Sequence, residues 1–236
     1  MGRNHFFQFK QFRIVQEKAA MKVGIDGVML GAWARLEKAS RVLDIGAGTG
    51  LLALMAAQRS DAIVDAVELE REAADDARHN FEASPWNNRL HLFTAAFQDF
   101  ETEQKYDHIL SNPPFFENSP KSSDHKRARA RHSDSLSLEE LLGKSAGLLT
   151  EQGRISLILP AEKEEKLRSL ARQNGLFVNR LSRVSPDETR PPHRILAEMS
   201  FSPMLEESPE IFIRESATGN YTIQYRELTK DFYLAF

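Results

Sequence analysis

The feature that most constrains the fold is a glycine-rich turn between two apolar segments. "RVLDIG" (41–46) has the pattern of a short buried strand, and "LLALMAAQR" (51–59) has the composition of a buried helix. The turn that joins them, "DIGAGTG" (44–50), carries three glycines, which allow backbone conformations and close approaches that other residues forbid. This order predicts a strand, a tight turn and a helix, the first unit of a layered α/β fold.

The alternation of strand and helix continues along the chain. Further strands are expected at short apolar runs, and helices where apolar residues recur at helical spacing. The expected strands are 62–68, 90–97, 106–111 and 154–160, and the expected helices are 71–83, 137–149 and 162–174. This pattern predicts an α/β fold with an open, mostly parallel sheet and helices on both faces.

The tail from 176 onward is rich in β-forming residues. Its runs are "FVNRLSRV", "RILAEMSF", "EIFIRE" and "YTIQY", and "ATGN" (217–220) has the composition of a hairpin turn. Gly175 is expected to end the preceding helix in the left-handed conformation. Antiparallel strands are therefore expected at one edge of the sheet.

Composition narrows the class of protein. The chain has 236 residues, a formal net charge of −3 and no cysteine. Without cysteine, neither disulfides nor thiolate metal sites can form, which favours a reducing compartment, and no metal site is predicted. No apolar run reaches membrane-spanning length, and the N-terminus lacks a signal-peptide pattern. A cytoplasmic, monomeric protein is expected.

The glycine spacing favours one kind of ligand. The dinucleotide fingerprint has glycines at its first, third and sixth positions. Here the glycines are Gly46, Gly48 and Gly50, and Leu51 occupies the sixth position. The preceding acid, Asp44, would repel a diphosphate and attract a cationic ammonium or sulfonium group. S-adenosylmethionine is therefore favoured over NAD, and a glycine turn without a ligand is the alternative.

An acid ends the second expected strand. Glu68 would present its carboxylate at the carboxyl edge of the sheet, where open α/β sheets bind ligands. There it could accept hydrogen bonds from both hydroxyls of a ribose. Alone it would be a solvated strand-end acid, but the glycine turn before it favours the ribose contact. Glu70 is the substitute if the register differs by two residues.

An unusual motif, "SNPPFF" (111–116), follows the strand at 106–111. Two prolines fix the backbone, and two phenylalanines stand where a surface loop would turn polar. Together with "DIGAGTG" and the acid at 68, this motif resembles that of class I methyltransferases that act on amino groups.

The resemblance extends to segments outside the shared motifs. They are "FQFKQFRIVQEKAAMKVGIDGVMLGAWA" (7–34), "RARHSDSLSLEELL" (129–142) and "LTKDFYLAF" (228–236). These segments resemble the bacterial family that methylates N6 of adenosine 37 in valine tRNA. The likeness implies a Rossmann-like, mostly parallel, seven-stranded sheet with antiparallel C-terminal edge strands. It also implies S-adenosylmethionine as cofactor and the anticodon loop of a tRNA as partner.

The resemblance assigns the catalytic role to Asn112, Pro113 and Phe115. An exocyclic adenine amine is a poor nucleophile because its lone pair is delocalised into the ring. The side-chain oxygen of Asn112 and the carbonyl of Pro113 would accept its two N–H groups and localise the lone pair. Phe115 would stack on the adenine, a contact worth ~1–3 kcal/mol per base. A rigid turn whose phenylalanines lie in the core, Phe116 above all, is the alternative.

The resemblance leaves the cofactor's adenine without its usual acid. Related enzymes often place an acid after the third strand, and that position falls near Ala96. Asp99 or the backbone would then hold the adenine, although Asp99 could equally cap a turn.

The N-terminal stretch is expected to close over the methionine end of the cofactor. Asp26 is expected to N-cap the helix that follows. One face of that helix carries Met29, Ala32, Trp33 and Leu36. The resemblance places near the sulfonium Lys22, Val23, Gly24 and Asp26. Accordingly, 1–36 is predicted to form a cofactor-closing segment, and 37–236 a single methyltransferase domain.

Two basic stretches are expected to flank the mouth of the pocket. The first is 1–22, and the second, 121–132, carries Lys121, Lys126, Arg127, Arg129 and Arg131. Lysine and arginine bind phosphates without reading sequence, so the second group is predicted to contact substrate RNA. A solvated loop with incidental charge is the alternative.

Other functions remain open on the residues alone. A protein-glutamine methyltransferase would use the same motif, but that family carries an N-terminal helical domain for which this chain lacks room. A non-catalytic RNA-binding module of the same fold would be expected to lose Gly46, Gly48 or Asn112, and all three are present. A DNA adenine methyltransferase would need more sequence to read its target.

Overall fold

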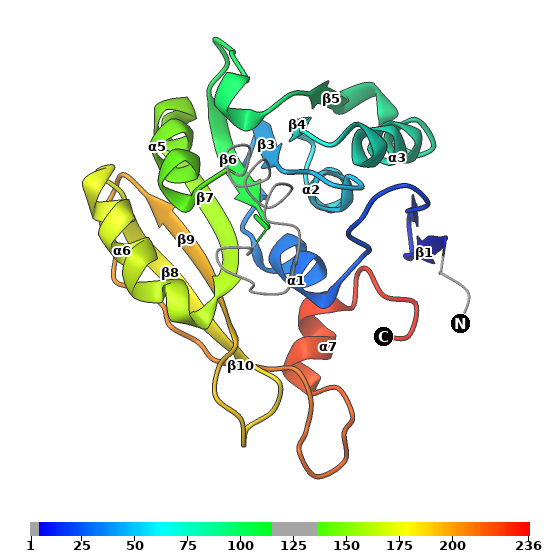
Figure 1. Cartoon of the computed structure of the whole chain (residues 1–236). Helices are drawn as coiled ribbons and strands as arrows, with labels where there is room; N and C mark the ends of the chain where they lie inside the picture. The colour runs from blue at the N-terminus through cyan, green and yellow to red at the C-terminus, as the bar shows by residue number, and fades with distance from the viewer. Residues whose placement is uncertain (1–4, 115–135) are drawn as a thin grey trace, which may run out of the picture.

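The computed structural model describes residues 5–114 and 136–236. Within these ranges the centre of the molecule is an eight-stranded sheet in the order β10-β8-β9-β7-β6-β3-β4-β5 (Figure 1). Its strands are β3 (Arg41–Ile45), β4 (Ile63–Glu68), β5 (Leu90–Thr94), β6 (Tyr106–Ser111), β7 (Leu149–Pro160), β8 (Phe177–Ser185), β9 (Arg194–Ser200) and β10 (Ile211–Phe212). Strands β3 to β7 are parallel, and β9 runs antiparallel to both of its neighbours.

The sheet confirms the expected open, mostly parallel architecture with antiparallel strands at the C-terminal edge. The two-residue strand β10 pairs in parallel with β8 and adds an eighth strand to the expected seven. The run expected as a strand to residue 97 is shorter, because β5 ends at Thr94 and the 3₁₀ turn η2 (Phe97–Asp99) follows.

Helices cover both faces of the sheet, each over its own hydrophobic core (Figure 1). One face carries α5 (Leu138–Leu148) and α6 (Glu164–Gln173). The other carries α1 (Ile25–Trp33), α2 (Leu51–Arg59) and α3 (Arg71–Glu82). None of the helices in the described ranges is long and apolar enough to cross a bilayer.

Helix boundaries follow from local chemistry. Ser137 starts α5 with a capping box, in which its hydroxyl accepts from the Glu140 amide and the Glu140 carboxylate accepts from the Ser137 amide. Gly175 follows α6 with φ +71°, so the expected left-handed end is confirmed.

The run "YTIQY" is not a strand, and this expectation was wrong. Tyr221 makes one isolated bridge to Arg214 around the expected turn, and the chain then enters α7 (Ile223–Thr229). The Thr222 hydroxyl caps the helix by accepting from the Tyr225 amide at 3.1 Å. Tyr225 and Thr229 are fully buried one helical turn apart, so burial of this face overrides the β propensity of the run.

The two ends of the chain pack together. A small antiparallel hairpin, β1 (Phe6–Gln8) and β2 (Arg13–Val15), lies against the C-terminal tail. The Lys10 ammonium, at the hairpin turn, donates to the carbonyls of Lys230 and Phe236, both at 2.6 Å. Figure 1 shows β1 and the C-terminal end of the chain on the same side of the molecule.

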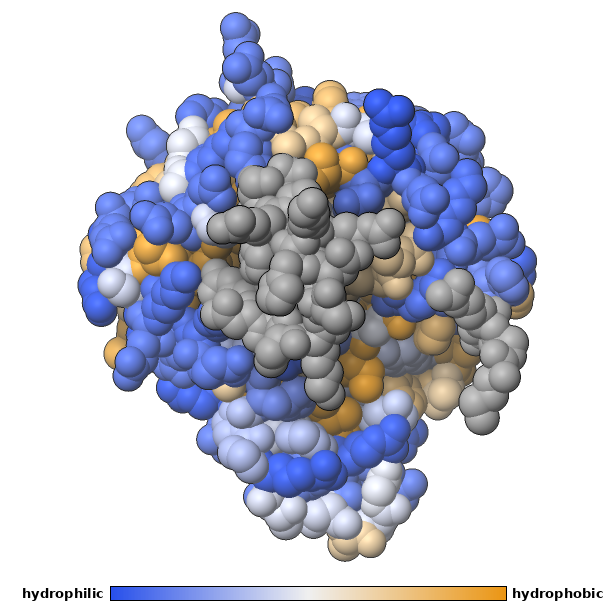
Figure 2. All heavy atoms as spheres, viewed as in Figure 1, coloured by the Kyte–Doolittle hydropathy of each residue, from blue (hydrophilic) through white to orange (hydrophobic). Residues whose placement is uncertain are grey.

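Two loops project together beyond the end of β8. The β8–β9 loop and the turn after β10 are joined by hydrogen bonds from Arg214 N to Pro186 O, at 3.0 Å, and from Ser216 N to the Glu188 carboxylate, at 3.2 Å. In Figure 2 this lower part of the molecule is mostly hydrophilic. The Glu188 carboxylate therefore accepts a hydrogen bond that joins the two loops to each other.

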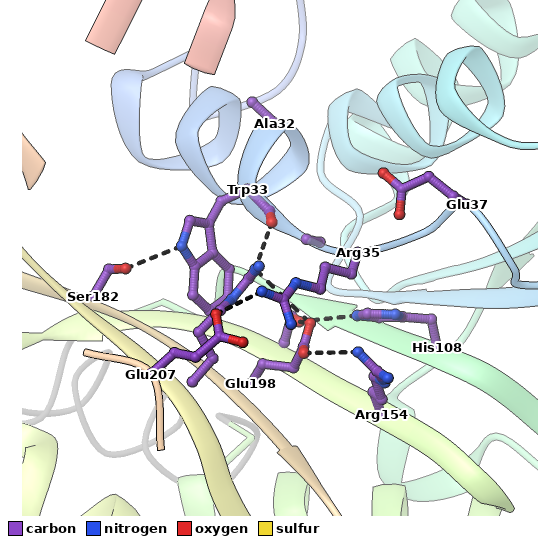
Figure 3. Close-up of polar contacts among 12 residues, drawn as sticks. Ala32, Trp33, Arg35, Glu37, His108, Arg154, Ser182, Glu198 and Glu207 are labelled. Carbon is purple, nitrogen blue, oxygen red and sulfur yellow. Dashed lines mark hydrogen bonds and ion pairs between the residues drawn. The ribbon is translucent and has the colours of Figure 1, made fainter. Parts of the chain in front are cut away.

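A buried polar network fixes the C-terminal end of α1 to the sheet (Figure 3). The Trp33 indole donates to the Ser182 hydroxyl at 3.1 Å, and the Arg180 guanidinium lies 3.5 Å above the Trp33 ring and donates to its carbonyl. Glu198, which is buried, accepts from Arg154 at 3.1 Å and lies 3.8 Å from Arg180. The helix is thus attached to the antiparallel half of the sheet.

Candidate active site

Three polar residues of the sequence prediction converge at the carboxyl edge of the sheet. Asp44 on β3, Glu68 at the end of β4 and Asn112 just after β6 come from neighbouring parallel strands. The strand order reverses between β3 and β6, which makes this the topological switch point of the sheet. Ligands of open α/β sheets bind at this position.

The three glycines of the turn have positive φ for different reasons. Gly46 and Gly48, with φ of +72° and +57°, have no atom within 4 Å of the position where a Cβ would stand. Gly50, with φ +81°, would place a Cβ only 2.4 Å from the Phe81 ring of α3. Gly46 and Gly48 therefore leave open space for a ligand, whereas Gly50 allows α2 and α3 to pack closely.

The Glu68 carboxylate is fixed at the strand end. One oxygen accepts from the Gly48 amide at 2.7 Å, and the other accepts from the Glu70 amide at 2.8 Å. Glu68 is 8% exposed, and each of its carboxylate oxygens retains a second lone pair that can accept a hydrogen bond from a hydroxyl group. Glu70 lies beyond the strand, where it precedes the first residue of α3.

Asp44 lies beneath the glycine turn and is fully buried. Its Oδ2 accepts from the Ala53 amide of α2 at 3.0 Å, while its Oδ1 has no hydrogen-bond partner within the described residues. Burial raises the pKa of the Asp44 carboxyl to about 7, with a further increase from the charge of Glu68 that opposes the effect of the Ala53 amide. The candidate site therefore contains an acid that a nearby cation would stabilise in its charged form.

Asn112 presents an unsatisfied acceptor. The preceding Ser111 hydroxyl donates to the Ile45 carbonyl at 2.7 Å, which joins the end of β6 to β3. The Asn112 side-chain oxygen is buried and has no hydrogen-bond partner in the described part of the chain. Pro113 is buried and Pro114 is exposed. Buried acceptors without partners are rare, so this oxygen is ready to accept from a ligand N–H.

The N-terminal stretch uses its side chains differently from what the sequence suggested. The N-cap of α1 is Gly24, with no side-chain hydrogen bond, so the prediction that Asp26 caps the helix was wrong. Asp26 lies one residue inside the helix and accepts from Arg194 Nε of β9 at 2.7 Å. The Lys22 ammonium donates to the backbone carbonyls of Gln16 and Ala19. Cofactor contacts for Lys22, Gly24 and Asp26 stay predictions.

Two large apolar side chains near the carboxyl ends of β4 and β5 are exposed. Leu69, directly after Glu68, is 45% exposed, and Phe93 on β5 is 41% exposed. Asp99 is exposed at the end of η2, and its role stays a prediction. Sequence reasoning missed Leu69, although an apolar residue directly after a strand-end acid was the available signal. Such a side chain offers an apolar face to a purine.

The comparisons with known proteins show the family of this chain. Residues 30–173 match the family model described as "Methyltransferase small domain". A tRNA1(Val) (adenine(37)-N6)-methyltransferase from Parabacteroides distasonis is 44% identical over 233 residues, which cover 98% of each chain. Its counterpart from Aliivibrio fischeri is 42% identical over 229 residues, or 97% of each chain. The chain belongs to the tRNA1(Val) (adenine(37)-N6)-methyltransferase family.

A solved structure supports the fold of this family member. A predicted O-methyltransferase from Agrobacterium tumefaciens superposes with a TM-score of 0.68, covering 88% of this chain and 96% of its own, at 17% identity. At that identity the likeness concerns the fold alone.

Part of the predicted site lies outside the described residues. This part comprises Phe115 and the five cations Lys121, Lys126, Arg127, Arg129 and Arg131. Their roles in stacking and in binding RNA therefore stay predictions from the sequence.

Proposed function

We propose that this protein transfers a methyl group from S-adenosylmethionine to N6 of an adenine in tRNA, namely A37 of tRNA1(Val). The observation that carries the proposal is the buried, unpartnered side-chain oxygen of Asn112 at the switch point of a methyltransferase sheet. Family membership supports the choice of substrate, since the relatives bear this activity in their names.

The glycine turn and its acids fit the cofactor. The open faces of Gly46 and Gly48 admit a ligand close to the backbone, and the Glu68 carboxylate beside them suits a ribose. The unpartnered Oδ1 of Asp44 would favour a cationic methionine moiety. S-adenosylmethionine supplies a sulfonium-bound methyl group: the new C–N bond forms as the C–S bond breaks, S-adenosylhomocysteine leaves, and the methylated nitrogen releases a proton to water.

The protein's own contribution is to orient the target amine. The Asn112 side-chain oxygen and the Pro113 carbonyl would accept the two N6–H groups, which localises the nitrogen lone pair toward the methyl group. The flanking prolines restrict the backbone that carries both acceptors, so the acceptors are ordered before substrate binds. Alignment of the reacting atoms supplies the rest of the rate. An asparagine at this position supplies no strong base, and none is needed once the ammonium has formed.

The partner and the place of action follow from the substrate. We propose a cytoplasmic enzyme that binds the anticodon loop of its tRNA, with the cations of 121–131 contacting phosphates. A monomer that needs no metal ion is part of the same proposal.

Two measurements test the function. Purified protein, labelled methyl donor and total tRNA lacking this modification should yield labelled N6-methyladenosine, located by mass at position 37 of tRNA1(Val). In the Asn112→Ala variant, turnover should fall below detection while S-adenosylmethionine binding, measured by calorimetry, stays close to that of the wild type. Unchanged methylation by Asn112→Ala would contradict the proposed mechanism. Label on a protein glutamine instead of tRNA would show that the protein is a glutamine methyltransferase.

A further inference from the structure

The first turn of α1 lies beside two parts of the candidate site, the start of α2 and Asn112. A Cβ added at Gly27 would lie 2.9 Å from Cδ2 of Leu51 and 3.9 Å from the side-chain nitrogen of Asn112. Leu51 is the first residue of α2, directly after the glycine turn. Glycine within a helix costs roughly 1 kcal/mol relative to alanine, so the close approach at this position explains its presence. The first turn of α1 therefore lies next to both Leu51 and the Asn112 side chain.

An ion pair holds this turn against the edge of the sheet. Asp26 Oδ2 accepts from Arg194 Nε at 2.7 Å, and the two side chains are 25% and 26% exposed. Arg194 is the first residue of β9 and pairs with Pro160, the last residue of β7, so it stands at the carboxyl edge. The Arg194 guanidinium also donates to the His193 carbonyl at 3.0 Å. The pair therefore links α1 to the same edge that carries Asn112.

We infer that the Asp26–Arg194 ion pair positions the pocket for the target amine. By holding the first turn of α1, it keeps Gly27 against Asn112 and so orients the amide oxygen that accepts from the amine. The inference rests on the proposed function. Asp26 is then a positioning residue that acts through Asn112, and the sulfonium contact expected from the sequence is not its role.

Single-turnover kinetics can separate positioning from cofactor binding. The variants are Asp26→Asn and Arg194→Gln, assayed with saturating S-adenosylmethionine and tRNA. Because small misplacements near reacting atoms are costly, the methyl-transfer rate should fall about 10- to 100-fold in each. The dissociation constant for S-adenosylmethionine, measured by calorimetry, should change by less than about twofold. In the double variant Asp26→Asn/Arg194→Gln the rate should be no lower than in the slower single variant, since both residues act through one contact.

The opposite end of the same helix offers a matched control. Arg35 follows α1 and pairs with Glu207 at 2.6 Å (Figure 3), a distance close to the 2.7 Å between Asp26 and Arg194. Asp26 and Trp33, the last residue of α1, are roughly 10 Å apart along the helix axis at 1.5 Å per residue, and Arg35 lies beyond that end. Arg35→Gln should leave the transfer rate unchanged. Thermal unfolding of each variant shows whether a loss of rate reflects unfolded protein.

Three results would overturn the inference. One is a loss of S-adenosylmethionine affinity that parallels the loss of rate, which would make Asp26 a cofactor contact. Another is a wild-type rate in both single variants. The third is a double variant in which the two losses multiply, because the residues would then act separately. A wild-type protein that methylates no tRNA would instead remove the proposed function, so the two failures are distinguishable.

Discussion

At the scale of single residues, the glycines of the turn have two different roles: one faces space that is open to a ligand, and another permits close packing of helices. Gly46 and Gly50 share the left-handed backbone, but only Gly50 has a neighbour, Phe81, where a side chain would stand. The same substitution should therefore have different consequences at the two positions.

Alanine at these two glycines provides the test. Gly46→Ala should cost about 1–2 kcal/mol of stability for its left-handed backbone and weaken S-adenosylmethionine binding by about tenfold or more. Gly50→Ala should cost about 2–5 kcal/mol, because the clash with Phe81 adds an overpacking penalty. Urea unfolding and calorimetric titration of both variants measure the two quantities. Equal losses of stability in the two variants would contradict the interpretation that Gly46, unlike Gly50, faces open space where a ligand binds.

The buried Asp44 predicts a pH dependence of stability. Because its pKa is raised from 3.8 to about 7, the folded protein holds a proton that the unfolded chain has released between these values. The stabilisation is therefore present at acid pH and is lost as pH rises toward about 7, at roughly 1.4 kcal/mol per pH unit at most.

The variant Asp44→Asn isolates this contribution. Other titrating groups, such as His108, whose pKa burial lowers to about 3, are common to both proteins and cancel in the difference. The unfolding free energy of the wild type minus that of Asp44→Asn should decrease from pH 5 to pH 7 and level off above it. A constant difference across this range would mean that Asp44 is ionised in the folded protein throughout.

At the scale of elements, the segment after the target motif is expected to bind RNA. Neutralising Lys126, Arg127, Arg129 and Arg131 should weaken tRNA affinity and reduce the slope of log affinity against log salt by about 0.7 for each phosphate that the protein no longer neutralises. The control neutralises Lys38 and Lys105, which precede β3 and β6 and so lie at the opposite edge of the sheet. Filter binding across a salt series measures both slopes. Equal changes per charge in the two variants would make the segment a bystander.

The sequence predicted the elements whose signal is local. Strands β3, β4 and β6, the glycine turn and Glu68 follow from short apolar runs and their end residues. The element α7 was misread because its helical state depends on burying Tyr225 against Tyr233 and Phe236, which lie outside the run itself. The partner of Asp26 could not be foreseen either, because Arg194 lies 168 residues away in the chain. Long-range pairing leaves no periodicity in a sequence.

At the scale of the whole molecule, the candidate site lies where the two halves of the sheet meet. The parallel half supplies the glycine turn, Glu68 and Asn112, while the antiparallel half supplies Arg194. Helix α1 connects the two, since its first turn lies beside Asn112 and its last contacts β8. The position of the target pocket is thus a property of the assembled sheet rather than of one loop.

The contact between the β1–β2 hairpin and the C-terminal tail has a consequence for biosynthesis. The β1–β2 hairpin is synthesised well before Lys230 and Phe236, whose carbonyls accept hydrogen bonds from Lys10, because 220 and 226 residues separate them in the chain. At a synthesis rate of ~5–20 residues per second, about 10–50 seconds pass between the synthesis of the hairpin and that of these partners. A nascent chain that stalls before residue 230 would therefore carry a complete glycine turn and a hairpin held by its contacts to α3, such as that of Val15 with Asn80.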